Sequence, residues 1–399
     1  MNSEQPLPLF PAEQERAFPP QTMILSRLET PCLVLDEAKL ERNAARMRAH
    51  LELLGVKLRL HVKTAKSIDV ARRVLRSPDE PITVSTLREA EYFLANGVRD
   101  ILYAVGVTPN KFGHITDLRK RGARLAVILD NVDAAHAVAT HARASADRIP
   151  VLIEIDCDGH RSGMLPGDPA LIDVGRALAD GGCELRGVMT HAGSSYNCET
   201  VAAIKLMALQ ERDAVVSAAN ALRAAGLPCP VVSVGSTPTA TYAENLAGVT
   251  EVRAGVFVFF DLVMAGLQVC ALDDVALSVL ASVIGHQRDK GWIIVDAGWM
   301  AMSRDRGTAK QKRDQGYGLV CDVQGQPYAD LIMVDANQEH GVLAQRPGAP
   351  GPLPELPLGT LLRILPNHAC ATGAQHQAYQ IVRGGSEAIS ATWPRIAGW

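Results

Sequence analysis

Apolar and polar positions alternate along residues 58–63, where the even-numbered positions are apolar and the odd-numbered ones are Arg59, His61 and Lys63. On a β-strand this alternation sends the basic side chains to one face and the apolar ones to the other. Helical patterns at 40–55 and 67–77 flank the segment, which is typical of a parallel strand buried on both faces. We therefore expect the basic row to point into a protected site. A buried lysine there needs an ion pair, or it is kept partly neutral as a nucleophile that forms a Schiff base with a carbonyl.

The same theme of a short apolar strand followed by an amphipathic helix repeats along the first two thirds of the chain. Helices are readable from apolar spacing and from end signals, such as Gly55, the capping Asn131 and the Gly226 that ends the long pattern from residue 201. Eight strand and helix units predict an α/β fold, a closed (β/α)8 TIM barrel. The expected strands are 56–63, 81–86, 100–106, 124–130, 151–157, 185–192, 231–236 and 251–256.

After residue 265 the pattern changes to strands without long helices between them, at 275–286, 292–297, 331–334 and 360–365. This predicts a separate, mainly β C-terminal domain. The proline-rich stretch 346–358 is expected to form a surface loop on that domain. The expected organisation is an N-terminal extension over 1–27 that packs on the β domain, a barrel over 28–265 and the β domain over 266–399.

Composition narrows the class of function. The chain has 399 residues, 47% hydrophobic and 21% charged, with a net charge of −3 and scattered basic residues, so neither nucleic acid nor an anionic membrane surface is an expected partner. Small-molecule chemistry is expected instead. A basic leader followed by an apolar run is not present at the start, and no apolar stretch is long enough to cross a bilayer, so we expect a cytoplasmic protein. The eight dispersed cysteines favour reduced thiols over a disulfide framework.

Polar residues follow the expected barrel strands at their C-terminal ends, where barrels gather their functional groups. Taken singly, each is explained as well by helix capping or by a turn, because Asp, Ser and Thr often close strand-to-helix loops. Their joint placement around one rim favours a functional site. These residues are Lys63, Ser85, Thr86, Asp156, Asp158, Arg161, His191, Tyr196, Gly235, Ser236 and Thr237.

Two of these groups suggest a phosphorylated aldehyde cofactor. The small-residue loop 234–239 offers backbone N–H groups and hydroxyls that could bind a phosphate, although a tight Gly-Pro turn would be the better explanation if Lys63 did not complete the site. Arg161 could face a pyridine nitrogen and would leave it unprotonated, since two cationic partners repel each other. The alternative for Arg161 is a salt bridge between loops.

The β domain contains His368 and Cys370, two positions apart. On an extended segment both side chains project to one side and can hold one metal ion with an imidazole nitrogen and a thiolate. Two protein ligands leave open positions, which a Lewis-acid metal needs, and zinc, manganese, cobalt or magnesium are the candidates. Such a pair is otherwise most often a half-buried histidine near a core cysteine.

Taken together, several segments resemble the fold-type III pyridoxal phosphate enzymes of the D-threonine aldolase and D-serine dehydratase family, from about residue 28 to the C-terminus. That resemblance implies an alanine racemase-like N-terminal barrel. Within the family it is greatest, at 248–255, 258–264 and 362–370, to the dehydratases of D-threo-3-hydroxyaspartate. The segments that carry it are 59–67, 158–163, 190–196, 234–239, 296–306, 337–341 and 367–370.

The resemblance implies a role for each rim residue and for the metal pair. Lys63 is expected to hold pyridoxal 5'-phosphate as a Schiff base and to be the catalytic base, and a divalent metal ion is expected on the β domain. One departure is Ala65, where many relatives have a second histidine. The implied cofactor-binding residues are Lys63, His61, Arg161, Tyr196, Gly235, Ser236 and Thr237, and the implied metal ligands are His368 and Cys370.

The family's aldolases tend to carry His-x-Asp at the metal pair and its dehydratases His-x-Cys, so Cys370 favours elimination of water over retro-aldol cleavage. The expected substrate is a β-hydroxy D-amino acid: hydroxyaspartate would give oxaloacetate and ammonia, and D-serine would give pyruvate and ammonia. A retro-aldol lyase, a racemase and a non-catalytic carrier of the cofactor are the alternatives. Relatives of this fold form head-to-tail dimers, so a homodimer is expected.

A dicarboxylate substrate needs an additional cation. Arg304, Arg306 or Lys310 could supply it, although a solvated charged loop is the simpler interpretation of that segment. Glu339 and His340 are candidates for the metal's outer shell, where they would orient a ligand or a bound water.

Overall fold

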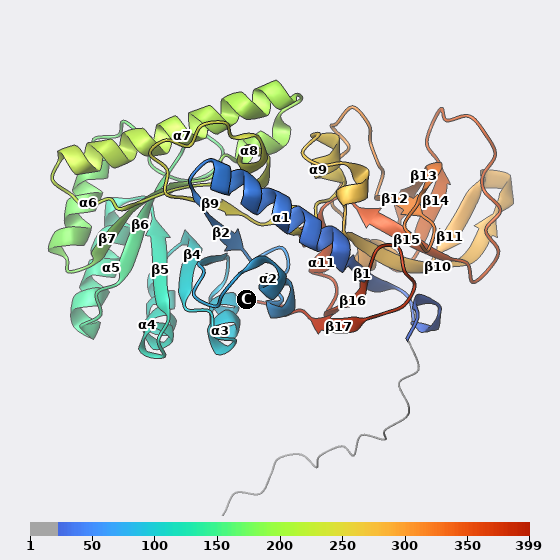
Figure 1. Ribbon diagram of the computed structural model, residues 1–399, viewed down its shortest axis with the longest axis horizontal. Coiled ribbons are helices and arrows are strands. Elements are labelled where there is room, and N and C mark those ends of the chain that lie inside the picture. Colours follow the sequence, from blue (N-terminus) through green and yellow to red (C-terminus); the bar gives the residue numbers. More distant parts are fainter. Residues whose placement is uncertain (1–22) are drawn as a thin grey trace, which may run out of the picture.

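Two units lie side by side in the computed structural model, which describes residues 23–399 (Figure 1). The first is a closed barrel of eight parallel strands, which confirms the expected (β/α)8 fold. All the expected strands are present, and most end earlier than the apolar pattern suggests. Their bounds are β2 (Lys57–His61), β3 (Ile82–Val84), β4 (Asp100–Gly106), β5 (Arg124–Leu129), β6 (Pro150–Ile155), β7 (Glu184–Thr190), β8 (Val231–Val234) and β9 (Glu251–Ala254).

Helices cover the outside of the barrel, and side-chain caps fix where several of them begin. Asp36 caps α1, Thr86 caps α3, Asn131 caps α5 and Thr200 caps α7, each by accepting a hydrogen bond from a backbone N–H of the first turn. Thr86 therefore acts as a helix cap, which was the simpler alternative to a place in the functional site. The helices are α1 (Glu37–Leu53), α2 (Ile68–Val74), α3 (Leu87–Ala95), α4 (Phe112–Lys120), α5 (Val132–Ser145), α6 (Ala170–Asp180), α7 (Val201–Ala224), α8 (Thr237–Tyr242) and α9 (Leu262–Gly266).

The second unit is built on a nine-stranded, mostly antiparallel sheet in the order β11-β14-β13-β12-β15-β10-β1-β16-β17. The expected β domain is confirmed, and the proline-rich stretch 346–358 lies in the connection from β14 to β15. Two short helices, α10 (Trp299–Met302) and α11 (Ala369–Gly373), interrupt it. The strands are β1 (Cys32–Asp36), β10 (Leu277–Gln287), β11 (Trp292–Val295), β12 (Gly318–Cys321), β13 (Pro327–Ala336), β14 (Gly341–Gln345), β15 (Leu361–Pro366), β16 (Ala378–Val382) and β17 (Ala391–Pro394).

The expected start of the barrel at residue 28 differs from the structure in one respect. Strand β1 pairs with β10 and β16 and so belongs to the large sheet, and only α1 leads the chain into the barrel. Just before it, Leu25 is fully buried and its N–H donates to the carbonyl of Glu387 at 2.9 Å. Residues 23–27 thus pack on the β domain, whereas the rest of the expected extension, 1–22, lies outside the described residues.

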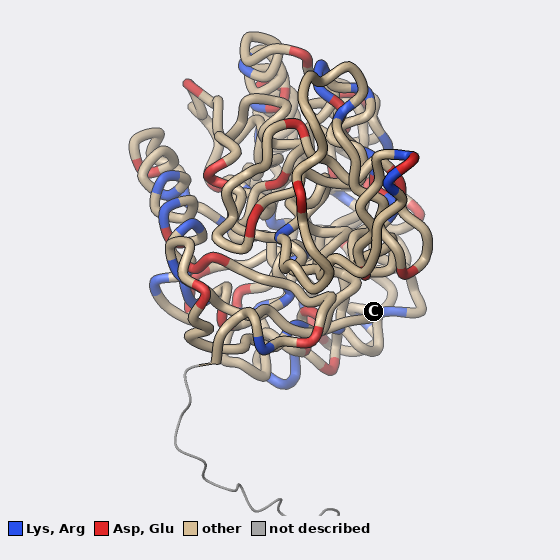
Figure 2. Tube along the Cα trace, turned by 90° about the vertical axis from the view of Figure 1, so that its right-hand side faces the viewer, with Lys and Arg blue, Asp and Glu red and all other residues tan. Residues whose placement is uncertain are grey.

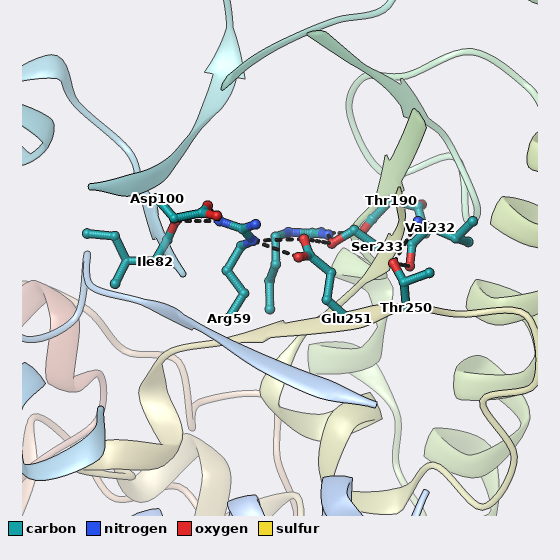
Figure 3. Close-up of polar contacts among 9 residues, drawn as sticks. Arg59, Ile82, Asp100, Thr190, Val232, Ser233, Thr250 and Glu251 are labelled. Atoms are coloured by element: carbon teal, nitrogen blue, oxygen red, sulfur yellow. Dashed lines mark hydrogen bonds and ion pairs between the residues drawn. The ribbon is translucent and has the colours of Figure 1, made fainter. Parts of the chain in front are cut away.

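Inside the barrel, a layer of charged side chains accounts for the first residue of the basic row. Arg59 donates from Nε to Glu251 at 2.8 Å and from Nη1 to Asp100 at 2.8 Å, and Glu251 also accepts from Ser233 (Figure 3). The expectation that the whole basic row faces a functional site is therefore wrong for Arg59, which is an ion-pair partner in the barrel core. The interior also contains an apolar cluster of Leu102, Ile128, Leu152 and Met189.

Charges of both signs are dispersed over the described part of the chain (Figure 2), as the sequence indicates. None of the helices within residues 23–399 combines the length and the apolar character needed to cross a membrane.

Candidate active site

The turn that carries Lys63 lies where the barrel meets the β domain. Residues 62–65 form this turn after β2, so Lys63 lies beyond the end of the strand. The alternation predicted a buried lysine, and this prediction is wrong, because Lys63 is exposed. The β domain contacts the turn directly, because Tyr379 donates to the carbonyl of Ala65 at 2.6 Å and the N–H of Ile396 donates to the carbonyl of Lys66 at 2.9 Å. The lysine is thus presented by a turn that both domains fix.

Two imidazoles, His61 at the end of β2 and His191 just after β7, lie within electrostatic reach of Lys63. Burial lowers the pKa of His61 well below its ordinary value, and the charges of Lys63, Arg253 and His191 add to this effect. Burial likewise lowers the pKa of His191 to about 3, although its Nδ1 lies 2.5 Å from the carbonyl of Gly235. Both rings are therefore neutral at physiological pH, and both belong to one electrostatic neighbourhood with Lys63.

The loop 234–239, which was expected to bind phosphate, follows β8, and the N–H of Gly235 already donates to a side chain of the protein. Gly235 has φ +152°, and a Cβ on it would lie 1.9 Å from the carbonyl oxygen of Arg253, so only glycine fits. Its N–H donates to Glu211 at 3.0 Å and is not free for a ligand, contrary to the expectation. Ser236 caps α8 and bonds Thr239 and Ser195 at 2.9 Å each.

The hydroxyl of Thr237 is the atom of this loop that lacks a partner. Thr237 is 1% exposed, and its Oγ1 is buried with no hydrogen-bond partner in the described structure. A buried hydroxyl of this kind costs free energy unless a ligand or water satisfies it. The loop therefore fits an oxyanion such as a phosphate at Thr237, whereas the Gly235 N–H and the Ser236 hydroxyl already have partners within the protein.

Tyr196 connects this loop with the metal pair. Burial raises the pKa of its phenol, and the negative charges of Cys370, Asp261 and Glu211 raise it further, while a hydrogen bond with the backbone of Thr237 opposes them. The phenol therefore stays protonated and lies between the two expected halves of the site.

Arg161 reaches the same region from the loop after β6. It is exposed, and its Nη2 lies 3.8 Å from the carboxylate of Glu154. Its charge also contributes to the low pKa of His191, although burial of that ring is the main cause. This placement is compatible with both of the expected roles, the pyridine contact and the ion pair.

His368 and Cys370 are brought together, but by a different local structure from the one expected. His368 is the N-cap residue of α11 and Cys370 lies within that helix, so the pair is not on an extended segment. The sulfur of Cys370 lies 3.2 Å from Oγ1 of Thr64, the neighbour of Lys63 in the chain. The pair therefore faces the lysine turn across the domain boundary.

The charges around this pair favour a thiolate beside a protonated imidazole. Burial alone would lower the pKa of His368, but hydrogen bonds with Asp305 and Cys370 raise it to about 11. Burial alone would raise the pKa of Cys370, but His368, Lys63 and the Thr64 hydroxyl together lower it. A metal ion would have to displace the Nε2 proton of His368, and the neutral imidazole with the thiolate is then a donor set that suits zinc and similar ions. Within residues 23–399 no group of three or more His, Cys, Asp or Glu side chains could hold a metal, so the protein would supply two ligands and leave the others open.

The outer-shell expectation is not supported where it was placed. Glu339 and His340 are exposed in the turn between β13 and β14, and no hydrogen bond joins either side chain to His368 in the described part of the chain. The carboxylate that contacts His368 belongs instead to Asp305, whose Oδ2 lies 2.7 Å from Nδ1.

The three candidate cations for a second substrate carboxylate differ in their surroundings. Arg306 is paired with Asp314 at 2.7 Å and stacks on Tyr317. Arg304 lies over the ring of Trp299 at 4.2 Å and is exposed, as is Lys310.

Two site residues escaped the sequence patterns. Glu211 accepts from the N–H groups of Ala192 and Gly235, at 3.0 Å each, and so ties together the loops after β7 and β8. Its signal was a carboxylate in the buried stripe of α7, between Ala208 and Val215. Asp305 gave no such signal, because it stands in a charged loop and its partner is 63 positions away.

A parallel barrel with a lysine turn at its rim, capped by a β domain that supplies an imidazole and a thiol, is the architecture of an alanine racemase-like two-domain protein. Residues 35–263 match the family described as "Alanine racemase, N-terminal domain", and residues 276–382 match "Putative serine dehydratase domain". The chain belongs to the fold-type III pyridoxal phosphate family of the D-threonine aldolases and D-serine dehydratases, as the motifs indicate.

Among its relatives, D-threo-3-hydroxyaspartate dehydratase of Delftia sp. (strain HT23) is 57% identical over 378 residues, covering 94% of this chain and 99% of the relative. D-serine dehydratase of Dictyostelium discoideum is 28% identical, covering 93% and 97%. The solved structure of a cysteine-to-alanine variant of D-threo-3-hydroxyaspartate dehydratase, described as a metal-free form, matches with a TM-score of 0.91 at 56% identity and covers 94% of this chain and 100% of that chain.

Proposed function

We propose that this chain is a dehydratase, an ammonia-lyase that depends on pyridoxal phosphate and a divalent metal ion. Its substrate would be D-threo-3-hydroxyaspartate, and its products oxaloacetate and ammonia. The observation that carries the proposal is the contact of Thr64 with Cys370 at 3.2 Å, because it sets the Lys63 turn directly against the imidazole and thiol of the β domain. The 57% identity to a dehydratase of this substrate supports the same conclusion.

The residues of the rim fit the cofactor as follows. The unpartnered hydroxyl of Thr237 would bind its phosphate, Lys63 would bind its aldehyde, and Tyr196, Arg161 and His61 would line its ring. When bound, pyridoxal phosphate withdraws electrons from the substrate Cα and so makes the Cα proton acidic.

The protein's own groups then handle the proton. Lys63 would take it at Nζ once its amine is released from the cofactor. His61 and His191 stay neutral, so their rings add no positive charge that would compete with this transfer.

His368 and Cys370 would hold the divalent ion and leave positions open toward the lysine turn. An ion held there supplies a Lewis acid, which makes the β-hydroxyl a better leaving group. The metal is zinc, manganese, cobalt or magnesium, and reconstitution of the chelated enzyme with each ion distinguishes them.

Ammonia release from D-serine, D-threonine and the four 3-hydroxyaspartate isomers tests the proposal, with and without added divalent ions. We expect the D-threo isomer to be the preferred substrate and to yield equal amounts of oxaloacetate and ammonia. Lys63→Ala should lose both turnover and the visible absorbance of covalently bound cofactor. A variant that keeps this absorbance would contradict the role of Lys63, and the absence of ammonia from every substrate would contradict the dehydratase.

Retro-aldol cleavage is the second candidate activity, because aldolases belong to the same family. It would give glycine and acetaldehyde from D-threonine, without ammonia, so the same assay separates the two reactions. A non-catalytic carrier of the cofactor would need no second domain with an imidazole and a thiol at the lysine turn. We also propose that the protein is a homodimer, which light scattering of the purified protein tests.

A further inference from the structure

We infer that Asp305 and Thr64 are the positioning residues of the metal pair: Asp305 fixes the ring of His368, and Thr64 fixes the sulfur of Cys370. The inference rests on the proposed function, because it presupposes that this pair binds a divalent ion. It assigns the outer shell to two residues on different domains, in place of Glu339 and His340.

The backbone of the pair is already fixed by a second carboxylate, that of Asp261. Asp261 is 2% exposed, and its Oδ2 accepts the N–H of Ala369, the residue between His368 and Cys370, at 3.0 Å. Its Oδ1 accepts the N–H of Met264 at 3.0 Å, so the carboxylate itself is held from both sides. What remains free in the pair is therefore rotation of the two ligand side chains.

Asp305 removes that freedom from the imidazole. Its Oδ2 lies 2.7 Å from Nδ1 of His368, which makes Nδ1 the protonated ring nitrogen and leaves Nε2 for a metal. Asp305 is itself held, because its Oδ1 accepts the N–H of Gly307 at 2.7 Å and its carbonyl accepts the side-chain N–H of Asn367 at 3.0 Å. A carboxylate fixed in this way orients the ring rather than follows it.

Thr64 does the same for the sulfur. It is fully buried, and its Oγ1 lies 3.2 Å from Sγ of Cys370. A thiolate ligand carries no proton, so in the metal-bound protein the hydroxyl would be the donor of this hydrogen bond. Because Thr64 directly follows Lys63, the contact also sets the position of the ion relative to the lysine.

The test uses the holoenzyme, freed of metal by a chelator and titrated with Co²⁺, whose absorption reports thiolate coordination through a charge-transfer band. Asp305→Asn and Thr64→Val are close in shape to the native residues and keep the backbone contacts of their segments. We expect each to weaken Co²⁺ affinity by about 10-fold to 100-fold, as loss of an outer-shell partner does. Thr64→Val should also shift the charge-transfer band, Asp305→Asn should leave that band in place, and Thr64→Ser should restore both affinity and band.

Two matched controls remove similar groups elsewhere. Asp314→Asn removes a carboxylate of the same loop region that pairs with Arg306, and Thr116→Val removes a hydroxyl that lies 2.9 Å from the ring of His141. Both should bind Co²⁺ as the unsubstituted enzyme does. If either control lowered the Co²⁺ affinity as much as Asp305→Asn or Thr64→Val does, the inference would be overturned. The loss of affinity would then follow from removing any such group and not from the contact with the metal pair.

The outcomes separate the inference from the proposed function. If the unsubstituted holoenzyme does not bind Co²⁺, or if His368→Ala and Cys370→Ala bind it unchanged, the metal site itself is wrong and the inference falls with it. If those two substitutions abolish binding while Asp305→Asn and Thr64→Val bind within twofold of the unsubstituted enzyme, the metal site stands and the positioning role is wrong.

Discussion

Replacing Glu211 by leucine should loosen the phosphate loop and destabilise the protein. The Oε1 of Glu211 accepts the N–H groups of Ala192 and Gly235 at 3.0 Å each, and its side chain is 2% exposed. In Glu211→Leu both donors are left buried without a partner, at about 1–3 kcal/mol each, so we expect a loss of about 2–6 kcal/mol in the free energy of unfolding. Glu211→Gln keeps an acceptor at Oε1 and should lose less than about 2 kcal/mol, because only the charge assistance of the two bonds is removed.

Urea unfolding followed by circular dichroism measures the stability difference, and titration with pyridoxal phosphate measures the effect on the loop. We expect the leucine variant to bind the cofactor more weakly than the glutamine variant, since Gly235 loses the bond that fixes the backbone next to Thr237. The matched pair separates the missing acceptor from the missing charge. A leucine variant with unchanged stability and cofactor affinity would refute the reasoning.

Three further outcomes are expected. Glu251→Ala leaves Arg59 buried with one fewer carboxylate and should lower the free energy of unfolding by about 3–5 kcal/mol; a loss below about 1 kcal/mol in urea would contradict the ion-pair role. Since burial lowers the pKa of His191 to about 3, its ring is neutral in the folded protein but takes up a proton in the unfolded chain below pH 6.5. Stability should therefore fall as the pH drops from 6.5 toward 3, by up to about 1.4 kcal/mol per pH unit from this residue, and His191→Asn should show a shallower decline in a series of unfolding curves. Chelation of the metal should stop ammonia release while the visible absorbance of the cofactor persists, and turnover that survives exhaustive metal removal would rule out the Lewis-acid role.

Local patterns of the sequence determined the barrel and the identity of the principal chemical groups. The strands of the barrel were predicted because apolar alternation and helix end signals act over a few residues, and Asn131 and Thr86 do cap the helices that follow them. Lys63, Thr237, His368 and Cys370 were selected by their positions after expected strands or by motif resemblance. The same local patterns could not predict which sheet a strand joins, because that depends on which distant strands it pairs with. Strand β1 looks like any apolar strand, and only its pairing with β10 and β16 shows that it belongs to the second sheet.

Tertiary structure alone decided the roles of the charged residues. Arg59 shares a strand with His61, yet its partner Glu251 is 192 positions away and turns it into a core ion pair. Thr64 meets Cys370 across 306 positions, and His368 meets Asp305 across 63. A charged or hydroxyl side chain has no fixed role by itself, because its free energy depends on which opposite charge or hydrogen-bond partner the fold brings to it. The sequence could therefore propose Lys63 and the pair His368 and Cys370 as site residues, whereas only the packing of the β domain against the barrel rim shows which residues contact them.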